Sequence, residues 1–269
     1  MRRIRAALFC AVLALSASLL LARIHPFGDA GLYAPHSAGT PILSNAQMLS
    51  PAVPAEVRAI LVEKCADCHS NQTRAPLYGH FAPVSWLMER DIVEARNAMN
   101  LSLWDTYSPD RQQTLAAKIV QETKSNRMPP AQYRMIHRNA RIVDADLRIF
   151  GQWAHGSQPA QADASVAAEG DPARGKALFE KRCTGCHALT QNKEGPQLQT
   201  VYGRTSGTVP NFAYSAALKQ AQLVWDNRSL EKWLTDPDAF IPGNDMDFLV
   251  SNPQERSDLI SFLKQNSGR

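Results

Sequence analysis

Two five-residue segments of this chain each combine two cysteines with a histidine: Cys65-Ala66-Asp67-Cys68-His69 and Cys183-Thr184-Gly185-Cys186-His187. Two thiols separated by two residues lie within about one helical turn, so both can form thioethers with the vinyl groups of one haem. The histidine that follows can then reach the iron. The pattern predicts two haem c attachment sites, with thioethers at Cys65, Cys68, Cys183 and Cys186 and iron ligands at His69 and His187.

Other readings of a C-x-x-C pair fit this chain less well. A thioredoxin-like redox pair does not need the trailing histidine, and no βαβ pattern surrounds either motif. A four-cysteine zinc site needs its pairs about 15–20 residues apart, whereas Cys65 and Cys183 lie in different halves of the chain. A disulfide across two residues would be strained and would leave the histidine unexplained.

Length and composition indicate two soluble domains behind an apolar leader. A chain of 269 residues fits two domains of about 100–150 residues each. The net charge of +4 is offset by four haem propionates, which argues against nucleic acid as a partner. Four of the five cysteines belong to the two motifs, and the fifth, Cys10, lies in the leader.

The N-terminal segment has the composition of an export signal. Basic residues 1–5 precede an apolar run over residues 6–22. Residues 16–18 resemble a small-residue cleavage site, but three leucines follow it. An uncleaved helix of about 17–25 residues can span a bilayer, with its basic end kept inside. We therefore interpret residues 1–22 as a signal peptide or membrane anchor, favour the anchor, and expect the remainder on the periplasmic side of a bacterial inner membrane.

Hydrophobic periodicity predicts helices and no convincing sheet. The expected fold class is all-α: two small helical haem c domains joined by a flexible linker, with an N-terminal apolar helix. Pro, Gly, Ser and Ala dominate the expected tether and linker. The expected boundaries are 1–22 for the leader, 23–54 for the tether, 55–156 for the first haem domain, 157–170 for the linker and 171–269 for the second haem domain. Helices are expected at 84–99, 110–123, 143–155, 172–182, 213–221, 229–234 and 254–265.

From Gly170 onward the chain resembles class I cytochrome c of the mitochondrial-like branch. The matching segments, beyond the second motif, are Gly195-Pro196, Tyr202 to Gly207, Phe212 to Ser215, Trp225, Pro242-Gly243, and Met246 to Phe248.

This resemblance implies that Met246 is the distal iron ligand and that Pro196, Arg204, Tyr214 and Trp225 surround the haem. The alternative role for Met246 is a buried gap-filler. Ligation by histidine and methionine leaves no position for a substrate, so it is typical of an electron carrier. The family usually has a lysine beside this methionine, but here Asn244-Asp245 precede it. The partner is therefore expected to be less acidic, or held by tethering.

Residues from about 56 to 153 resemble a short bacterial haem-binding domain with one C-x-x-C-H-S motif. This resemblance implies a cofactor more than an activity. The distal ligand is open among Met128, Met99, Met135, His80 and His137. We favour Met128, because Pro129-Pro130 stiffen the backbone after it. In addition, His69 precedes Met128 by the same number of positions as His187 precedes Met246.

The predicted function is a di-haem cytochrome c that carries electrons and is not an enzyme. Electrons would arrive from a dehydrogenase or quinol-oxidising complex and leave to a terminal oxidase or reductase. One alternative is a two-haem enzyme of the peroxidase or thiosulfate-oxidising kind, although the soluble part has no spare cysteine for a thiolate ligand. The other is a haem relay subunit of a dehydrogenase complex.

Overall fold

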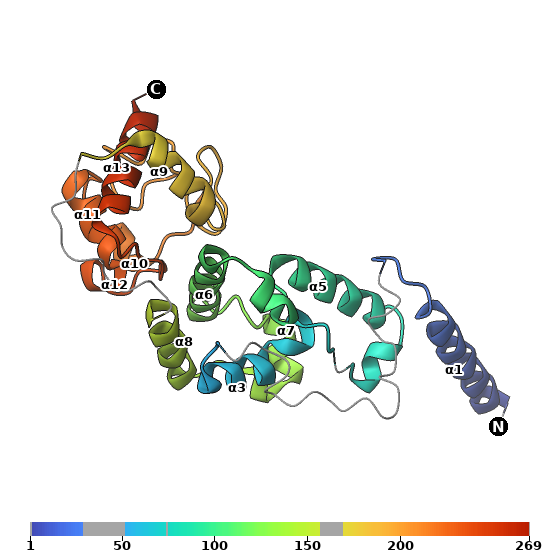
Figure 1. Cartoon of the computed structure of the whole chain (residues 1–269). Helices are drawn as coiled ribbons and strands as arrows, with labels where there is room; N and C mark the ends of the chain where they lie inside the picture. The colour runs from blue at the N-terminus through green and yellow to red at the C-terminus, as the bar shows by residue number, and fades with distance from the viewer. Residues whose placement is uncertain (1, 29–51, 74, 157–168, 269) are drawn as a thin grey trace. The chain divides into compact units, whose positions relative to one another are not determined.

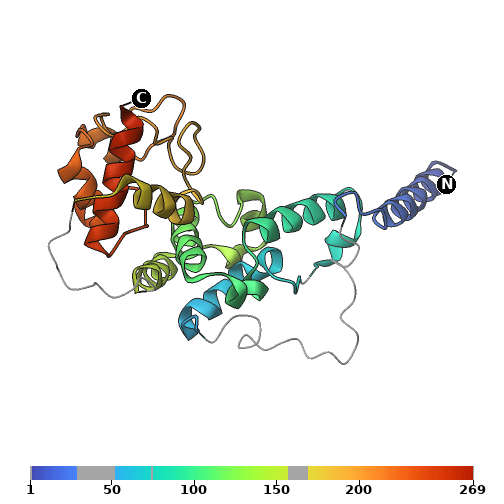
Figure 2. The same ribbon diagram turned by 45° about the horizontal axis from the view of Figure 1, so that its top comes forward.

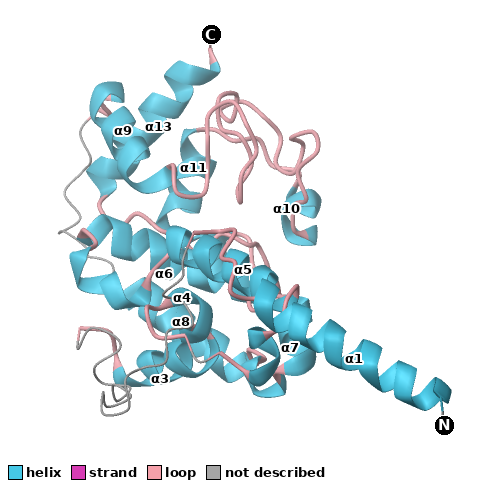
Figure 3. Cartoon of the chain, turned by 90° about the vertical axis from the view of Figure 1, so that its right-hand side faces the viewer, coloured by secondary structure: helices cyan, strands magenta, loops and turns pink. Residues whose placement is uncertain are grey.

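The computed structural model of the chain describes residues 2–28, 52–73, 75–156 and 169–268 (Figure 1). Most of the expected tether and linker lies outside these residues. In the described part of the chain the regular elements are all helical, and the all-α prediction is confirmed (Figure 3). An isolated antiparallel bridge joins Thr205 to Val224.

The chain divides into two compact units, residues 1–106 with 137–141 and residues 107–136 with 142–269. The first unit contains α1 (Arg2–Leu21), α3 (Ala55–Lys64), α4 (Ala66–His69), η2 (Leu77–His80), α5 (Val84–Ala98), η3 (Leu101–Thr106) and η4 (Arg138–Ala140). The second contains α6 (Pro109–Lys124), α7 (Ala131–Ile136), α8 (Asp144–Gly156), α9 (Pro172–Leu178), η5 (Phe179–Cys183), α10 (Ala216–Ala221), α11 (Asn227–Thr235), α12 (Pro237–Phe240) and α13 (Pro253–Ser267). Both α6 and α8 thus group with the C-terminal elements, and the boundaries expected from the sequence stay predictions.

Helix α1 is long and apolar enough to cross a membrane. Its most apolar window has a mean hydropathy of 2.2 and no residue buried within the protein. A signal sequence near the N-terminus has the same properties, so the helix fits either an export signal or an anchor.

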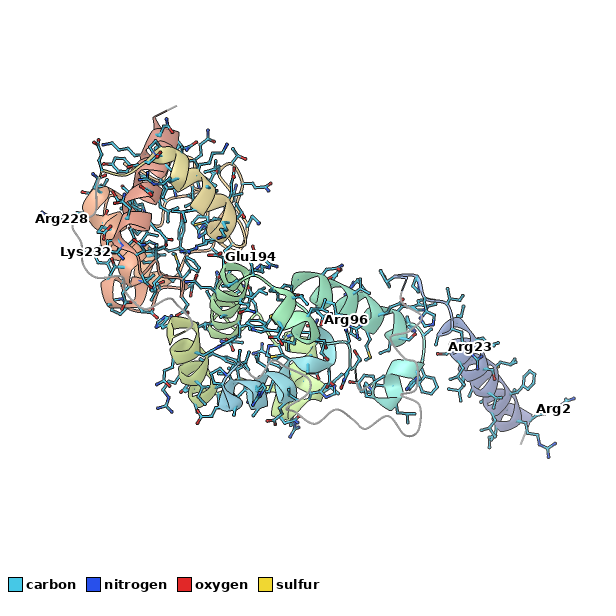
Figure 4. The ribbon with its side chains drawn as sticks, in the orientation of Figure 1. Arg2, Arg23, Arg96, Glu194, Arg228 and Lys232 are labelled. Atoms are coloured by element: carbon cyan, nitrogen blue, oxygen red, sulfur yellow. The ribbon has the colours of Figure 1, made fainter. Side chains whose placement is uncertain are left out.

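In the first unit, the short helix α4 is fixed between α5 and η3. Arg96 of α5, labelled in Figure 4, donates from Nε to the carbonyl oxygen of Ser70 at 2.8 Å and from Nη2 to Thr73 Oγ1 at 3.1 Å. The Nδ2 atom of Asn100 donates to Asn71 Oδ1 at 2.8 Å. These bonds hold the segment that carries the first C-x-x-C-H motif.

In the second unit, α9 and α13 cross in close contact (Figures 1 and 2). Gly175 allows this approach, because a Cβ atom there would overlap the backbone of Asp258. The rings of Phe179 and Phe262 pack beside the crossing, with centroids 5.3 Å apart. One π-helical turn, η5, then leads from α9 into the second C-x-x-C-H motif.

The expected helices over 84–99, 110–123 and 143–155 correspond to α5, α6 and α8 within one or two residues at each end. The helix expected from residue 213 instead begins at Ala216. The Oγ atom of Ser215 caps this helix by accepting from the backbone N–H of Leu218 at 3.3 Å. The residues before Ser215 form a loop in which the rings of Phe212 and Tyr214 pack edge to face.

Candidate haem sites

The second C-x-x-C-H motif forms a single tight turn at the end of η5. The backbone N–H groups of Cys186 and His187 donate to the carbonyl oxygen of Cys183 at 3.1 and 2.8 Å. This turn places both cysteines and the histidine on the wall of one cavity. A side chain at Gly195 would overlap the ring of His187, so glycine is required for the following loop to pass behind the imidazole.

The imidazole of His187 is oriented by a backbone carbonyl group. Its Nδ1 lies 2.8 Å from the oxygen of Pro196, which leaves Nε2 with its lone pair for a metal. Burial lowers the pKa of His187, although the bond to Pro196 opposes the shift. The ring therefore stays neutral, as an iron ligand must be.

The two half-buried thiols of this motif lie in an environment that disfavours thiolate. Burial raises the pKa of Cys183 to about 12 and that of Cys186 to about 11. Redox-active C-x-x-C cysteines have thiol pKa values below about 8. The surroundings thus suit two thiols held for thioether formation better than a dithiol exchange site.

One cavity brings together all the site residues that the sequence predicted for this domain. The two cysteines and His187 line it, with Pro196, Arg204, Tyr214, Trp225 and Met246. The methionine lies in the loop between α12 and α13. The C-x-x-C-H spacing predicts the two cysteines and His187, and the family resemblance implies the other five residues; the structure places all of them around one cavity.

Arg204 supplies an independent test of whether this cavity fits haem. Its Nε atom is buried and has no hydrogen-bond partner among the described residues. Burial also lowers the pKa of its guanidinium group. A half-buried arginine whose buried Nε donor is unsatisfied calls for an anion. A haem propionate meets that need, and the thiols, imidazole and thioether are the donors that a haem c site requires.

Asn244 is a functional residue whose role the sequence reasoning missed. Its Oδ1 accepts from the backbone N–H of Met246 at 2.6 Å, and its Nδ2 donates to Ile241 O and Asp238 Oδ1, both at 3.0 Å. The side chain is fully buried. Asn244 therefore fixes the loop that presents Met246. The available signal was an asparagine directly after Pro242-Gly243, a composition typical of a side-chain-capped turn.

The first motif repeats the same arrangement in the first unit. The Nδ1 atom of His69 lies 3.1 Å from the carbonyl oxygen of Met99, and burial lowers the pKa of this imidazole. Burial also raises the pKa of Cys68 to about 11. Because Nδ1 faces away from a metal held at Nε2, the carbonyl group of Met99 lies on the proximal side of this site. Cys65 lies at the junction of α3 and α4.

The distal position of the first site stays a prediction. The Nε2 atom of His137 is within 2.6 Å of the hydroxyl group of Tyr78, which occupies one of its two ring nitrogens. The side chain of Met135 is 78% exposed, against 38% for Met128. Met128 belongs to the second unit and His69 to the first. Its pairing with the first iron therefore rests on the sequence argument.

The fold and these sites define a c-type haem protein, and comparison with known proteins agrees. The haem-binding domain family matches residues 30–156, and the cytochrome c family matches residues 172–267.

Individual relatives match the C-terminal part. Cytochrome c of Euglena viridis is 47% identical over 98 residues, which are 35% of this chain and 96% of that protein. Cytochrome c2 of Rhodomicrobium vannielii is 40% identical over 110 residues, 39% of this chain and 87% of that protein. The solved structure of cytochrome cH from Methylobacterium extorquens is 39% identical, covers 36% of this chain and 99% of its own, and has a TM-score of 0.35.

The chain belongs to the cytochrome c family through its C-terminal domain and carries a haem-binding domain before it. Its cofactor is haem c with iron, and two haems fit the two domains. Electron transfer by haem is the activity that such domains imply.

Proposed function

We propose that this protein is a di-haem cytochrome c that carries electrons between redox proteins and catalyses no reaction of its own. The observation that supports it best is the repeated geometry of the two histidines. His69 and His187 each offer Nδ1 to a backbone carbonyl oxygen, at 3.1 and 2.8 Å. Each imidazole is thereby oriented with Nε2 available for iron. Haem, when bound, supplies a one-electron ferric–ferrous couple.

The proposed attachment residues are Cys65 and Cys68 for the first haem and Cys183 and Cys186 for the second. Met246 is the proposed distal ligand of the second iron and Met128 that of the first. A thioether is a soft ligand that stabilises ferrous iron and raises the reduction potential. The buried clamp of Asn244 on the Met246 loop keeps this ligand in place. A fixed sixth ligand excludes substrate and limits rearrangement on reduction, which favours a carrier over an enzyme.

Around the second haem, Arg204 is proposed to bind a propionate through the Nε donor that lacks a partner. Trp225 and Tyr214 line the same cavity, and the carbonyl group of Pro196 holds the proximal imidazole. These residues bind and orient the macrocycle and exclude water from it. A water-poor site favours fast electron exchange, because little solvent must reorganise when the charge changes.

The partners we propose are redox proteins: a dehydrogenase or quinol-oxidising complex as donor, and a terminal oxidase or reductase as acceptor. We place the two domains on the periplasmic side of a bacterial inner membrane. The apolar helix α1 supports this location, since it fits an export signal or an anchor. An anchor would confine the protein to the surface where quinol-linked partners lie and raise their effective concentration.

The proposed function is tested by counting haems and electrons in purified protein. We expect intact-mass analysis to find two covalent haems, and the variants Cys65→Ala/Cys68→Ala and Cys183→Ala/Cys186→Ala to retain one each. A spectroelectrochemical titration should then resolve two one-electron steps, with no turnover of peroxide or thiosulfate. Sustained turnover of either compound, or a single haem per wild-type chain, would overturn the proposal.

A further inference from the structure

One face of α6 lies against the haem-attachment loop of the C-terminal domain. The residues that make these contacts recur every three or four positions, so they share one side of the helix. The opposite side carries apolar residues such as Leu115 and Ile119, which are buried. The residues on the contacting face are Asp110, Thr114, Lys118, Gln121 and Lys124.

The centre of this contact is the residue between the two haem cysteines. A Cβ atom on Gly185 would lie 2.6 Å from the Cγ2 methyl of Thr114, so a larger residue at position 185 would have to displace the side chain of Thr114. The hydroxyl group of Thr114 also lies 3.4 Å from the carbonyl oxygen of Arg182. Thr114 and Ala117 line the same cavity as Cys186. Helix α6 therefore covers the cysteine-bearing edge of the haem cavity.

Complementary charges flank that centre. At the start of α6, Asp110 lies 2.6 Å from both Lys181 Nζ and Arg182 Nε. Burial alone would raise the pKa of Asp110, but the hydrogen bonds from the two cations outweigh it and leave the pKa lowered. Further along, Lys118 Nζ lies 2.6 Å from Glu194 Oε1, and Glu194 is labelled in Figure 4.

The pairing continues to the last turn of the helix. Lys124 Nζ lies 3.1 Å from Asp238 Oδ1 and 3.7 Å from Asp247 Oδ2. On this face of α6, Asp110 thus lies against bases of the C-terminal domain, and Lys118 and Lys124 lie against acids. Such a pattern fixes the register of a docked helix and disfavours other orientations.

We propose that the cysteine-bearing edge of the C-terminal haem cavity is an internal docking surface, occupied by α6 and closed to external redox proteins. This inference rests on the proposed electron-transfer function. A helix is about 10 Å across, so α6 keeps any external protein roughly that much farther from this edge. External partners of the C-terminal haem must approach from another side or displace α6. Internal docking also suits a chain with Asn244-Asp245 in place of a steering lysine.

The contact itself is tested by zero-length carbodiimide cross-linking of the full-length holoprotein. We expect tandem mass spectrometry to find an amide between Lys118 and Glu194, and none in Lys118→Arg. The exposed pair Lys176 and Glu180, 3.7 Å apart, serves as an internal positive control. A product at Lys176–Glu180 without one at Lys118–Glu194 would overturn the docking.

The closure of this haem edge to external redox proteins is tested by measuring how fast another protein reduces the C-terminal haem. Reduction of the C-terminal iron by a reduced soluble cytochrome c is followed through its ferric signal in freeze-quenched samples, with hexaammineruthenium(II) as a small reductant. We expect Lys118→Glu to speed reduction by the soluble cytochrome c about fivefold or more, because a carboxylate at position 118 repels Glu194 and loosens α6. Reduction by hexaammineruthenium(II) should change much less. Adding Glu194→Lys should restore the wild-type rate.

Lys176→Glu, which makes the same change of charge at an exposed site, should behave as wild type. Lys118→Glu protein that keeps both low-spin ferric signals but is reduced at the wild-type rate would overturn the closure and leave the proposed electron-transfer function standing. A wild-type protein that shows fewer than two low-spin ferric signals would instead contradict the electron-transfer function.

Discussion

The Nδ1 atom of His187 lies 2.8 Å from the carbonyl oxygen of Pro196, and this single bond fixes what the imidazole can do. With Nδ1 engaged, the ring can offer only Nε2 to a metal, in one orientation. Gly195 makes the contact sterically accessible, because any side chain there would overlap the ring. A motif of two cysteines and a histidine thus depends on a glycine and a proline eight and nine residues further on.

Replacing Met246 with alanine should open the second iron without releasing its haem. The thioethers at Cys183 and Cys186 keep the macrocycle attached, while the sixth position loses its ligand. We expect two covalent haems by mass, conversion of one haem to a high-spin ferric form, and binding of one cyanide per chain. Leu77→Ala, at an exposed apolar side chain that is no ligand candidate, serves as the control. An unchanged spectrum in Met246→Ala would refute this ligand assignment.

Replacing Met128 with alanine should have the same effect on the first iron alone. The rival ligands are tested beside it by His80→Ala and His137→Ala. The latter should leave both irons low-spin, although it removes the 2.6 Å contact with Tyr78. Loss of one low-spin signal in His137→Ala or His80→Ala, with Met128→Ala unchanged, would move the distal ligand to that histidine.

Replacing Arg204 with glutamine should lower the reduction potential of the second haem only. A partly buried positive charge near the haem favours ferrous iron over the more positive ferric iron, and the buried Nε donor of Arg204 has no hydrogen-bond partner among the described residues. We expect a fall of about 60 mV, the equivalent of a tenfold change for a one-electron couple. Arg228→Gln removes an exposed charge from the same domain and is the matched control. Equal potentials in wild type and Arg204→Gln would contradict the propionate contact.

Asp258 should make the stability of the C-terminal domain depend on acid pH. It joins α13 to α9 by accepting from Arg174 Nε and from the N–H of Asp171, both at 2.8 Å. Burial alone would raise its pKa, but the bonds from Arg174, Asp171 and Gln254 outweigh it and lower the pKa in the folded protein. The stabilisation is therefore fully present above about pH 4, the ordinary aspartate pKa, and is lost as pH falls through the lowered value.

Thermal unfolding of Asp258→Asn measures this contribution. At pH 7 we expect a loss of about 1–2 kcal/mol, a modest figure because Arg174 is 55% exposed. The difference from wild type should shrink below about pH 4. Glu180→Gln, at an exposed carboxylate, should have little effect at either pH. A difference that does not change with pH would show that Asp258 acts through its shape and not its charge.

Much of this fold and its sites can be predicted from local sequence patterns. Helices α5, α6 and α8 follow from hydrophobic periodicity, and each C-x-x-C-H turn follows from its own spacing. The sequence pattern predicts the start of α10 too early, because Ser215 ends the preceding loop by capping the helix. Arg204 and Met246 were identified by resemblance, and the structure brings them to the same cavity.

Contacts between segments far apart in the chain could not be predicted from the sequence. The approach of Thr114 to Gly185 joins residues far apart in the chain, and no local pattern reports it. In the sequence alone, the charged residues Asp110, Lys118 and Lys124 of α6 indicate a solvent-exposed helix face. In the sequence Asn244 is only a departure from a family lysine, whereas in the structure its buried hydrogen bonds to the Met246 loop give it a positioning role.

Low-temperature EPR of the oxidised, purified protein tests the central claim most directly. If both haems are held by a histidine and a second protein ligand, the spectrum contains two low-spin ferric signals of equal intensity. A stable high-spin signal from either haem would mean an open distal position. It would contradict a pure electron carrier and would point to chemistry at that iron.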